Sequence, residues 1–355
     1  MSLLYFKATN FRVYEETDLH LHPQYNLIYG DNASGKTSLL EAIGCLGRGR
    51  SFRGANTKEL VKHGASDFLL FGKTSTQQKH DKLGLTNGVG GVGLSVNGDQ
   101  KGGLESLARA LPLQVIDPNI HSLVAGPPEE RRRYLDWVVF HVEPSYLNLW
   151  RDYRRSLKQR NLLLKNNSSS NELKSWNKSL AKLGESINTL RSAVFEILEP
   201  SITQITSSLL GGEVSFLYER GWPDDFHLEQ VLIKNETRDL FLKSTQAGPH
   251  RADISIAFDT RIAKKQVSRG QQKLLACAMI LAAVEIVQEY TEQPLLLLLD
   301  DPAAELDSKS IKKLMKEVVS LSSQVIATSI NPDKSLFPEQ PNVFHVEHGV
   351  IKNIL

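Results

Sequence analysis

Residues 30–37 read Gly30-Asp31-Asn32-Ala33-Ser34-Gly35-Lys36-Thr37 and lie between an apolar run at 25–29 and a segment with helical periodicity at about 36–46. Such a glycine-rich loop, after a strand and before a helix, offers backbone N–H groups that cradle phosphates. The pattern predicts that these eight residues and Ser38 bind ATP. Lys36 would neutralise the β- and γ-phosphates, and Thr37 would hold Mg²⁺.

A second stretch, residues 294–301, has five consecutive leucines followed by Asp300 and Asp301. It predicts a buried strand that reaches the surface at its two carboxylates. We expect Asp300 to bind Mg²⁺, directly or through water, and Asp301 to orient or deprotonate the attacking water. Taken alone, a solvated strand end or a helix cap explains the two aspartates equally well. Beside the phosphate loop, Lys36, Asp300 and Asp301 become the predicted catalytic residues.

A third segment opens a long apolar helix, with Ser268 as the expected N-cap and Gly270 leaving room for a phosphate. An ordinary capped helix accounts for it in isolation, but its place between the phosphate loop and the acidic strand favours a functional interpretation. The segment resembles the signature motif of the ABC ATPase superfamily. That resemblance implies that Ser268, Arg269, Gly270 and Gln271 act on nucleotide held by another copy. Downstream, Glu305 and Asp307 resemble the D-loop of the same superfamily, and Gln114 is a candidate for the loop that senses Mg²⁺.

Further blocks follow one another from end to end of the chain in the order found in one family. They are Asn10-Phe11-Arg12, the phosphate loop, residues 49–53 and 58–60, residues 127–136, residues 248–253, the signature, and Asp300-Asp301 with Glu305-Leu306-Asp307. Together they make the chain similar to the RecF family of bacterial recombination and replication-repair ATPases, which are related to the heads of SMC proteins. The position after Asp300 carries Asp301 where transporters have Glu, and Thr328 or Ser329 stands where they have His. Both features are similar to RecF usage and suggest slow hydrolysis.

The resemblance implies an α/β fold: an ABC/SMC-type P-loop ATPase head with an inserted, mainly helical lobe that contains a short antiparallel coiled-coil-like hairpin. It also implies ATP-driven dimerisation on double-stranded or gapped DNA, weak DNA-dependent ATP hydrolysis with Mg²⁺, and loading of recombinase at gaps with RecO and RecR as partners. DNA repair, DNA replication and the response to DNA damage would be its setting, in the cytoplasm and at the nucleoid.

Hydrophobic periodicity gives the expected domain boundaries. Residues 1–120 are the N-terminal part of the head, 121–240 the helical insertion, and 241–355 the signature and the rest of the head. Between Leu173 and Ile197 apolar residues are spaced alternately by three and four, which predicts a heptad seam about 40 Å long in a helical hairpin. The seam could pack within the hairpin or against a partner.

The composition fits a globular chain of 355 residues with a formal net charge of +2. Its two cysteines exclude a disulfide framework and a cysteine-based zinc site. The longest uncharged apolar segments are shorter than the roughly 20 residues of a membrane span, so we expect a cytoplasmic protein.

Residues 131–165 carry nine Arg and Lys against three acidic residues. This strip is either a DNA-phosphate footprint or the solvated face of a helix, and Arg131–Arg133 could instead form buried ion pairs. The DNA-binding candidates are Arg131, Arg132, Arg151, Arg154, Arg155 and Lys158.

Other functions remain open from the sequence. A transporter nucleotide-binding subunit would use the same chemistry, but the basic helical insertion argues against it. A long coiled-coil chromosome protein needs far longer helices. A protein that binds ATP without turnover would have the same residues.

Overall fold

The computed structural model describes residues 1–76, 79–88, 91–167, 169–259, 261–304 and 306–354. The chain forms two compact units, 1–120 with 292–355 (unit 1) and 121–291 (unit 2). The predicted boundary between 240 and 241 lies inside unit 2, so residues 241–291, the signature included, belong with the helical part and not with the rest of the head. Helix α11 (Arg269–Thr291) packs on α7 (Ser170–Leu210), and this burial explains the difference.

Unit 1 contains a six-stranded sheet in the order β14-β13-β3-β12-β11-β7, in which only β14 is antiparallel to its neighbour. Because parallel strands end at one edge, the loops that follow β3, β11, β12 and β7 open on the same side of the sheet. Its strands are β3 (Tyr25–Tyr29), β7 (Leu113–Ile116), β11 (Leu296–Leu299), β12 (Gln324–Ser329), β13 (Asn342–Glu347) and β14 (Val350–Ile354). Every residue of β11 is buried, as the leucine run predicts.

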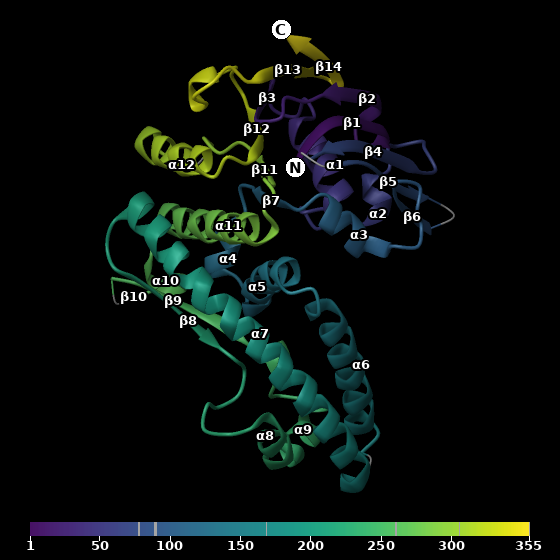
Figure 1. Ribbon diagram of the computed structural model, residues 1–355, viewed down its shortest axis with the longest axis vertical. Coiled ribbons are helices and arrows are strands. Elements are labelled where there is room, and N and C mark those ends of the chain that lie inside the picture. Colours follow the sequence, from purple (N-terminus) through teal and green to yellow (C-terminus); the bar gives the residue numbers. More distant parts are fainter. Residues whose placement is uncertain (77–78, 89–90, 168, 260, 305, 355) are drawn as a thin grey trace. The chain divides into compact units, whose positions relative to one another are not determined.

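A second, antiparallel sheet of unit 1 has the order β2-β1-β4-β5-β6. One core joins its inner face, the apolar side of α1 and the parallel sheet. Figure 1 shows these elements, whose bounds are β1 (Ser2–Phe11), β2 (Tyr14–His20), α1 (Lys36–Arg48), α2 (Thr57–Leu60), β4 (Phe68–Ser75), β5 (His80–Gly88), β6 (Gly91–Val96), α3 (Gly103–Ala110), α12 (Ser308–Ser320) and the 3₁₀ turn η2 (Lys334–Leu336).

Unit 2 is mainly helical, and α6 (Tyr146–Lys165) and α7 run side by side as the predicted hairpin (Figure 1). A small sheet, β10-β9-β8, completes the unit. The other elements are α4 (Ser122–Ala125), α5 (Pro128–Val142), β8 (Val214–Glu219), α8 (Leu228–Lys234), α9 (Glu236–Leu242), η1 (Pro249–Arg251), β9 (Asp253–Phe258), β10 (Arg261–Ile262) and α10 (Ala263–Gln266).

The heptad seam of α7 differs from the prediction in half of its positions. Leu173, Leu180, Ile187 and Val194 are buried, as predicted. The alternate apolar positions, from Trp176 to Ile197, are only partly buried or exposed, and the buried stripe passes one residue later through Asn177, Gly184, Arg191 and Leu198. The spacing of three and four is kept, but polar side chains occupy the seam because α5, α6 and η1 supply hydrogen-bond partners for Asn177 and Arg191.

Helix α11 is long and apolar enough to cross a membrane by length and composition alone. Its most apolar window is 72% buried within the structure. A helix that is apolar all round and covered by protein is the central helix of a core.

Candidate nucleotide site

The phosphate loop has the backbone that the glycine pattern predicts. Gly30 has φ 155° and Gly35 has φ 120°, where L side chains are strained. A Cβ on Gly30 would lie 2.2 Å from the Val346 carbonyl oxygen, and one on Gly35 would lie 2.9 Å from the Tyr14 hydroxyl. The loop is also held from two sides, because Tyr14 donates to the Gly35 carbonyl and the Gly349 N–H donates to the Ser34 carbonyl.

Two buried polar groups in the loop are placed to bind an anion. Lys36 is buried and its ammonium donates to the carbonyls of Gly30 and Asp31, at 2.7 and 2.8 Å. Desolvation lowers the pKa of Lys36, although Asp301, Asp300 and Asp31 act in the opposite direction. The Ser34 hydroxyl is buried without a hydrogen bond. An anion bound in the loop would satisfy both groups, so the residues present fit a phosphate.

The acidic edge of β11 meets the start of α1. Thr37 Oγ1 donates to Asp300 Oδ1 at 2.9 Å, and Asp300 is buried. Among the described residues there is no cluster of three or more His, Cys, Asp or Glu side chains, so the chain alone does not build a closed metal cage. A hydroxyl beside one buried carboxylate, with phosphate oxygens and waters as the other ligands, is the donor set that Mg²⁺ takes at such sites. Thr37 and Asp300 therefore fit Mg²⁺. Bound there with ATP, the cation would neutralise charge on the phosphates.

Asp301 follows at the same edge in a left-handed conformation, φ 46°. Its N–H donates to Thr328 Oγ1 at 2.8 Å, and its carboxylate is close enough to Lys36 to oppose the lowering of that pKa. The predicted trio of Lys36, Asp300 and Asp301 is thus brought together. In the sequence Thr328 is only one of two residues at the switch position, and nothing in the sequence pattern indicates its contact with both aspartates.

Gln114 does not join this group, and its prediction as a Mg²⁺ ligand is wrong. It lies in β7 opposite Leu297, three residues before Asp300, so its side chain points to the other face of the sheet. There it accepts a hydrogen bond from Arg48 at the far end of α1, about 16 Å along the helix from Thr37. Asp117, which follows β7, is instead at the edge where Asp300 lies, as the Asp300 N–H to Ile116 carbonyl bond of 2.8 Å shows.

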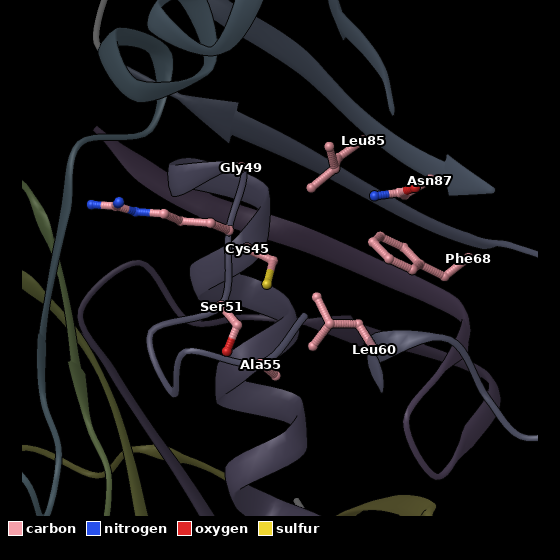
Figure 2. A pocket seen from close by; sticks show the side chains of 9 residues that line it. Cys45, Gly49, Ser51, Ala55, Leu60, Phe68, Leu85 and Asn87 are labelled. Carbon is pink, nitrogen blue, oxygen red and sulfur yellow. The ribbon is translucent and has the colours of Figure 1, made fainter. Parts of the chain in front are cut away.

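The cavity of unit 1 in Figure 2 is separate from this edge. It holds about 60 Å³ and is lined by residues from the C-terminal half of α1 onward, such as Cys45, Ser51 and Phe68. This volume is far below the roughly 300 Å³ of a small-molecule pocket. Arg12 and Ser51 instead converge nearby on buried Glu41, which accounts structurally for two of the family blocks.

The signature segment lies in unit 2 at the start of α11. Ser268 Oγ accepts from the Gln271 N–H and Gln271 Oε1 accepts from the Ser268 N–H, a capping box that confirms the predicted N-cap. Ser268, Arg269 and Gly270 are exposed. A Cβ on Gly270 would meet nothing within 4 Å, so no neighbour in the described structure requires a glycine there. Asp307, in unit 1, caps α12 through the N–H groups of Lys309 and Ser310, and Glu305 lies outside the described residues.

The basic strip divides into exposed and buried members. Arg151, Arg154, Arg155 and Lys158 are exposed on α6, with Arg155 3.5 Å from Asp152. Arg131 is wrong as a DNA-binding candidate, because it is 5% exposed and its guanidinium binds both carboxylate oxygens of Asp253.

Arg132 is half-buried and donates to the Ala252 carbonyl. Desolvation lowers the pKa of Arg132. Arg131 and Arg132 lie in the family block 127–136 and bind Asp253 and Ala252 of the family block 248–253. The two blocks therefore pair with each other and have a structural role.

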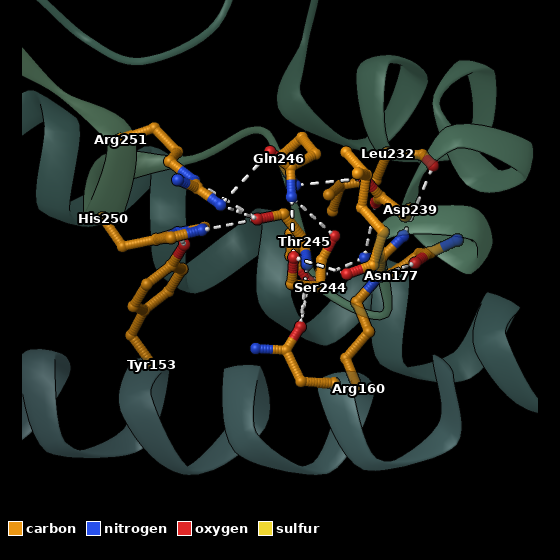
Figure 3. A network of polar contacts seen from close by, with 12 residues as sticks. Tyr153, Arg160, Asn177, Leu232, Asp239, Ser244, Thr245, Gln246, His250 and Arg251 are labelled. Carbon is orange, nitrogen blue, oxygen red and sulfur yellow. Dashed lines mark hydrogen bonds and ion pairs between the residues drawn. The ribbon is translucent and has the colours of Figure 1, made fainter. Parts of the chain in front are cut away.

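A buried polar network anchors the same segment to the hairpin (Figure 3). The Tyr153 hydroxyl oxygen lies 2.6 Å from His250 Nδ1, and His250 Nε2 is 3.1 Å from the Thr245 carbonyl oxygen. Fully buried Arg160 donates to Asn177, Asp239 and Thr245, each at 2.7 Å. Burial lowers the pKa of His250 to about 4. Arg160 is one of the nine basic residues of the strip in the sequence, but its charge is neutralised by Asp239 inside unit 2.

Known proteins with the same fold and sequence pattern support this description. The model of the RecF/RecN/SMC N-terminal domain matches residues 2–352. The DNA replication and repair protein RecF of Erwinia tasmaniensis is 36% identical over 99% of this chain and 98% of its own. A solved structure of the recombination mediator protein RecF with ATP, in the RecFOR pathway, is 27% identical with a TM-score of 0.89 and covers 100% of this chain and 98% of its own. An SMC head bound to the C-terminal winged-helix domain of ScpA covers 100% of this chain and 97% of its own, with a TM-score of 0.61 and 16% identity, and shows the head fold alone.

The resemblance read from the motifs, the α/β ATPase-head fold and these full-length matches agree. The chain belongs to the RecF family of DNA replication and repair proteins, within the RecF/RecN/SMC class of ATPase heads.

Proposed function

We propose that this protein is an ATP-gated clamp on DNA in recombinational repair and replication restart. Two copies would enclose two ATP molecules, each held by the phosphate loop of one copy and covered by Ser268 and Gly270 of the other. Slow hydrolysis at Asp301 would then separate the copies and release the DNA. RecO and RecR would be partners in loading recombinase at gaps, in keeping with the RecFOR pathway of the solved relative.

The observation that carries the proposal is the exposed signature. Ser268 and Gly270 stand on the surface of unit 2, and the glycine has no steric reason within the described structure. A backbone left open at a helix N-terminus suits an approaching phosphate. The phosphate loop, with its buried lysine and orphaned serine hydroxyl, supplies the complementary half.

In this mechanism Lys36 would bind the β- and γ-phosphates, giving up its two carbonyl contacts. Thr37 and Asp300 would hold Mg²⁺, and Asp301 would accept the proton of the attacking water or orient it. The exposed face of α6 would contact DNA phosphates. A transporter subunit is the alternative that the sequence left open, and full-length similarity to repair proteins favours the clamp.

The DNA part of the proposal is tested by fluorescence anisotropy of a labelled gapped duplex with ATP. A variant carrying Arg154→Ala and Lys158→Ala removes two exposed charges from α6, and the matched control carries Lys312→Ala and Lys316→Ala on exposed positions of α12. The slope of log affinity against log salt is negative, and we expect it to be shallower by about 2 in the α6 variant. The control should keep the wild-type slope. Equal slopes for both variants would place the DNA elsewhere.

A further inference from the structure

The end of β12 places one buried hydroxyl between the two catalytic aspartates. β12 and β11 are parallel with Leu299 opposite Ala327, so Thr328 stands beside Asp300. The Thr328 side chain is 0% exposed. A buried hydroxyl at this edge is costly unless both its proton and its lone pairs are used.

Both are used, and on different residues. Thr328 Oγ1 donates to Asp300 Oδ1 at 2.9 Å and accepts from the Asp301 N–H at 2.8 Å. Its distance to the Leu299 carbonyl oxygen, 3.5 Å, is longer, so the single hydroxyl proton goes to the carboxylate. One side chain thus fixes the orientation of Asp300 and the amide of Asp301.

Each contact matters for a separate reason. Asp300 Oδ1 also receives the Thr37 hydroxyl, which belongs to the phosphate loop, whereas Thr328 comes from the neighbouring strand and holds the carboxylate independently of that loop. Asp301 has φ 46°, a left-handed conformation that is unfavourable for a non-glycine residue and persists only where surrounding contacts hold it. The Thr328 oxygen is the contact that anchors its amide.

We infer that Thr328 is a positioning residue for ATP hydrolysis: its hydroxyl orients the Mg²⁺-binding carboxylate of Asp300 and holds the turn that presents Asp301. The inference rests on the proposed ATPase function. At the position where transporters have a histidine, this chain has a hydroxyl. That hydroxyl acts through the two carboxylates and not on the nucleotide itself.

The test compares Thr328→Val, which keeps the shape and removes the hydroxyl, with Thr328→Ser, which keeps the hydroxyl. Full-length wild type and both variants are titrated with Mn²⁺ beside a non-hydrolysable ATP analogue, with free Mn²⁺ read by electron paramagnetic resonance. Analogue affinity in EDTA and the steady-state rate with ATP and Mg²⁺ complete the set. We expect Thr328→Val to weaken Mn²⁺ binding at least about tenfold, as loss of an outer-sphere partner does, and to lower kcat by a similar factor. Its affinity for the analogue in EDTA should stay within about twofold, and Thr328→Ser should restore both properties.

Wild-type Mn²⁺ affinity and rate in Thr328→Val would overturn the inference. Equal damage in the valine and serine variants, or loss of analogue binding in EDTA, would do the same, because both outcomes indicate a packing defect. Failure of the proposed function looks different: wild type would then hydrolyse no ATP and match Asp301→Asn, while the Mn²⁺ comparison would still decide the role of Thr328.

Discussion

Replacing Arg160 by methionine removes the central charge of the polar network in unit 2 while keeping a side chain of similar length. Arg160 and Asp239 are both fully buried, and their closest N–O distance is 2.7 Å. After the change the Asp239 carboxylate keeps the Gln246 N–H, at 3.0 Å, but loses its countercharge. Thr245 and Asn177 lose a donor as well.

Breaking a buried ion pair from one side costs about 3–5 kcal/mol, because the remaining charge is left uncompensated. Burial raises the pKa of Asp239 even beside Arg160, so the carboxyl can take up a proton once the arginine is gone. We therefore expect the cost of Arg160→Met to be larger at pH 8 than at pH 5. Adding Asp239→Asn should recover at least about 1 kcal/mol of the loss at pH 8 by removing the stranded charge.

Urea unfolding followed by tryptophan fluorescence measures this cost selectively. All four tryptophans, at 137, 150, 176 and 222, lie in unit 2. The matched control is Arg155→Met, on the same helix but exposed and 3.5 Å from Asp152, which should change the free energy of unfolding by less than about 0.5 kcal/mol. A cost of Arg160→Met no larger than that of Arg155→Met would mean that the buried network does not stabilise unit 2.

Three further results are expected. Burial lowers the pKa of His250 to about 4, against 6.5 in the unfolded chain, so the unfolded chain binds more protons between these pH values. The free energy of unfolding of unit 2 should therefore fall by about 2 kcal/mol from pH 7 to pH 5. In the same urea assay, His250→Gln should remove most of this pH dependence. Gly30→Ala should abolish nucleotide binding because its Cβ meets a carbonyl oxygen, whereas Gly270→Ala should leave equilibrium binding to one copy intact and reduce hydrolysis; similar binding losses in both would contradict the assigned roles. Burial raises the pKa of Cys45 and of Cys277 to about 12, so a thiol reagent at pH 8 should label neither in the native protein and both in urea.

Much of the nucleotide site could be predicted because its chemistry is local in sequence. A phosphate loop needs its glycines, lysine and threonine within eight residues. An apolar run that ends in Asp300 and Asp301 indicates a buried strand with both carboxylates at its C-terminal end. The capping box at Ser268 is equally local, since its two partners are three residues apart.

The errors concern groups whose role depends on distant partners. Gln114 was assigned from its residue type, but strand register turns it toward Arg48. Arg160 counts as part of the basic strip in the sequence because its partner, Asp239, lies 79 residues away. For Arg131 the sequence leaves both DNA binding and a buried ion pair open, and it does not identify Asp253, 122 residues away, as the partner. The seam of α7 was read from apolar residues only, so Asn177 and Arg191, which are buried in it, were passed over.

ATP is proposed to join two copies through the exposed signature, and the mass of the protein in solution distinguishes such a dimer from a single chain. The mass would be measured by light scattering after size exclusion, with ATP and Mg²⁺, with ADP, and for Ser268→Arg with ATP, each with and without a gapped duplex. Without DNA, we expect about twice the 39.7 kDa of one chain with ATP and a single chain with ADP. The Ser268→Arg variant should stay monomeric although it still binds ATP. With the duplex, the ATP-bound dimer should retain the DNA. A mass that stays at one chain while ATP is bound, or a Ser268→Arg variant that dimerises like wild type, would contradict the proposed dimer.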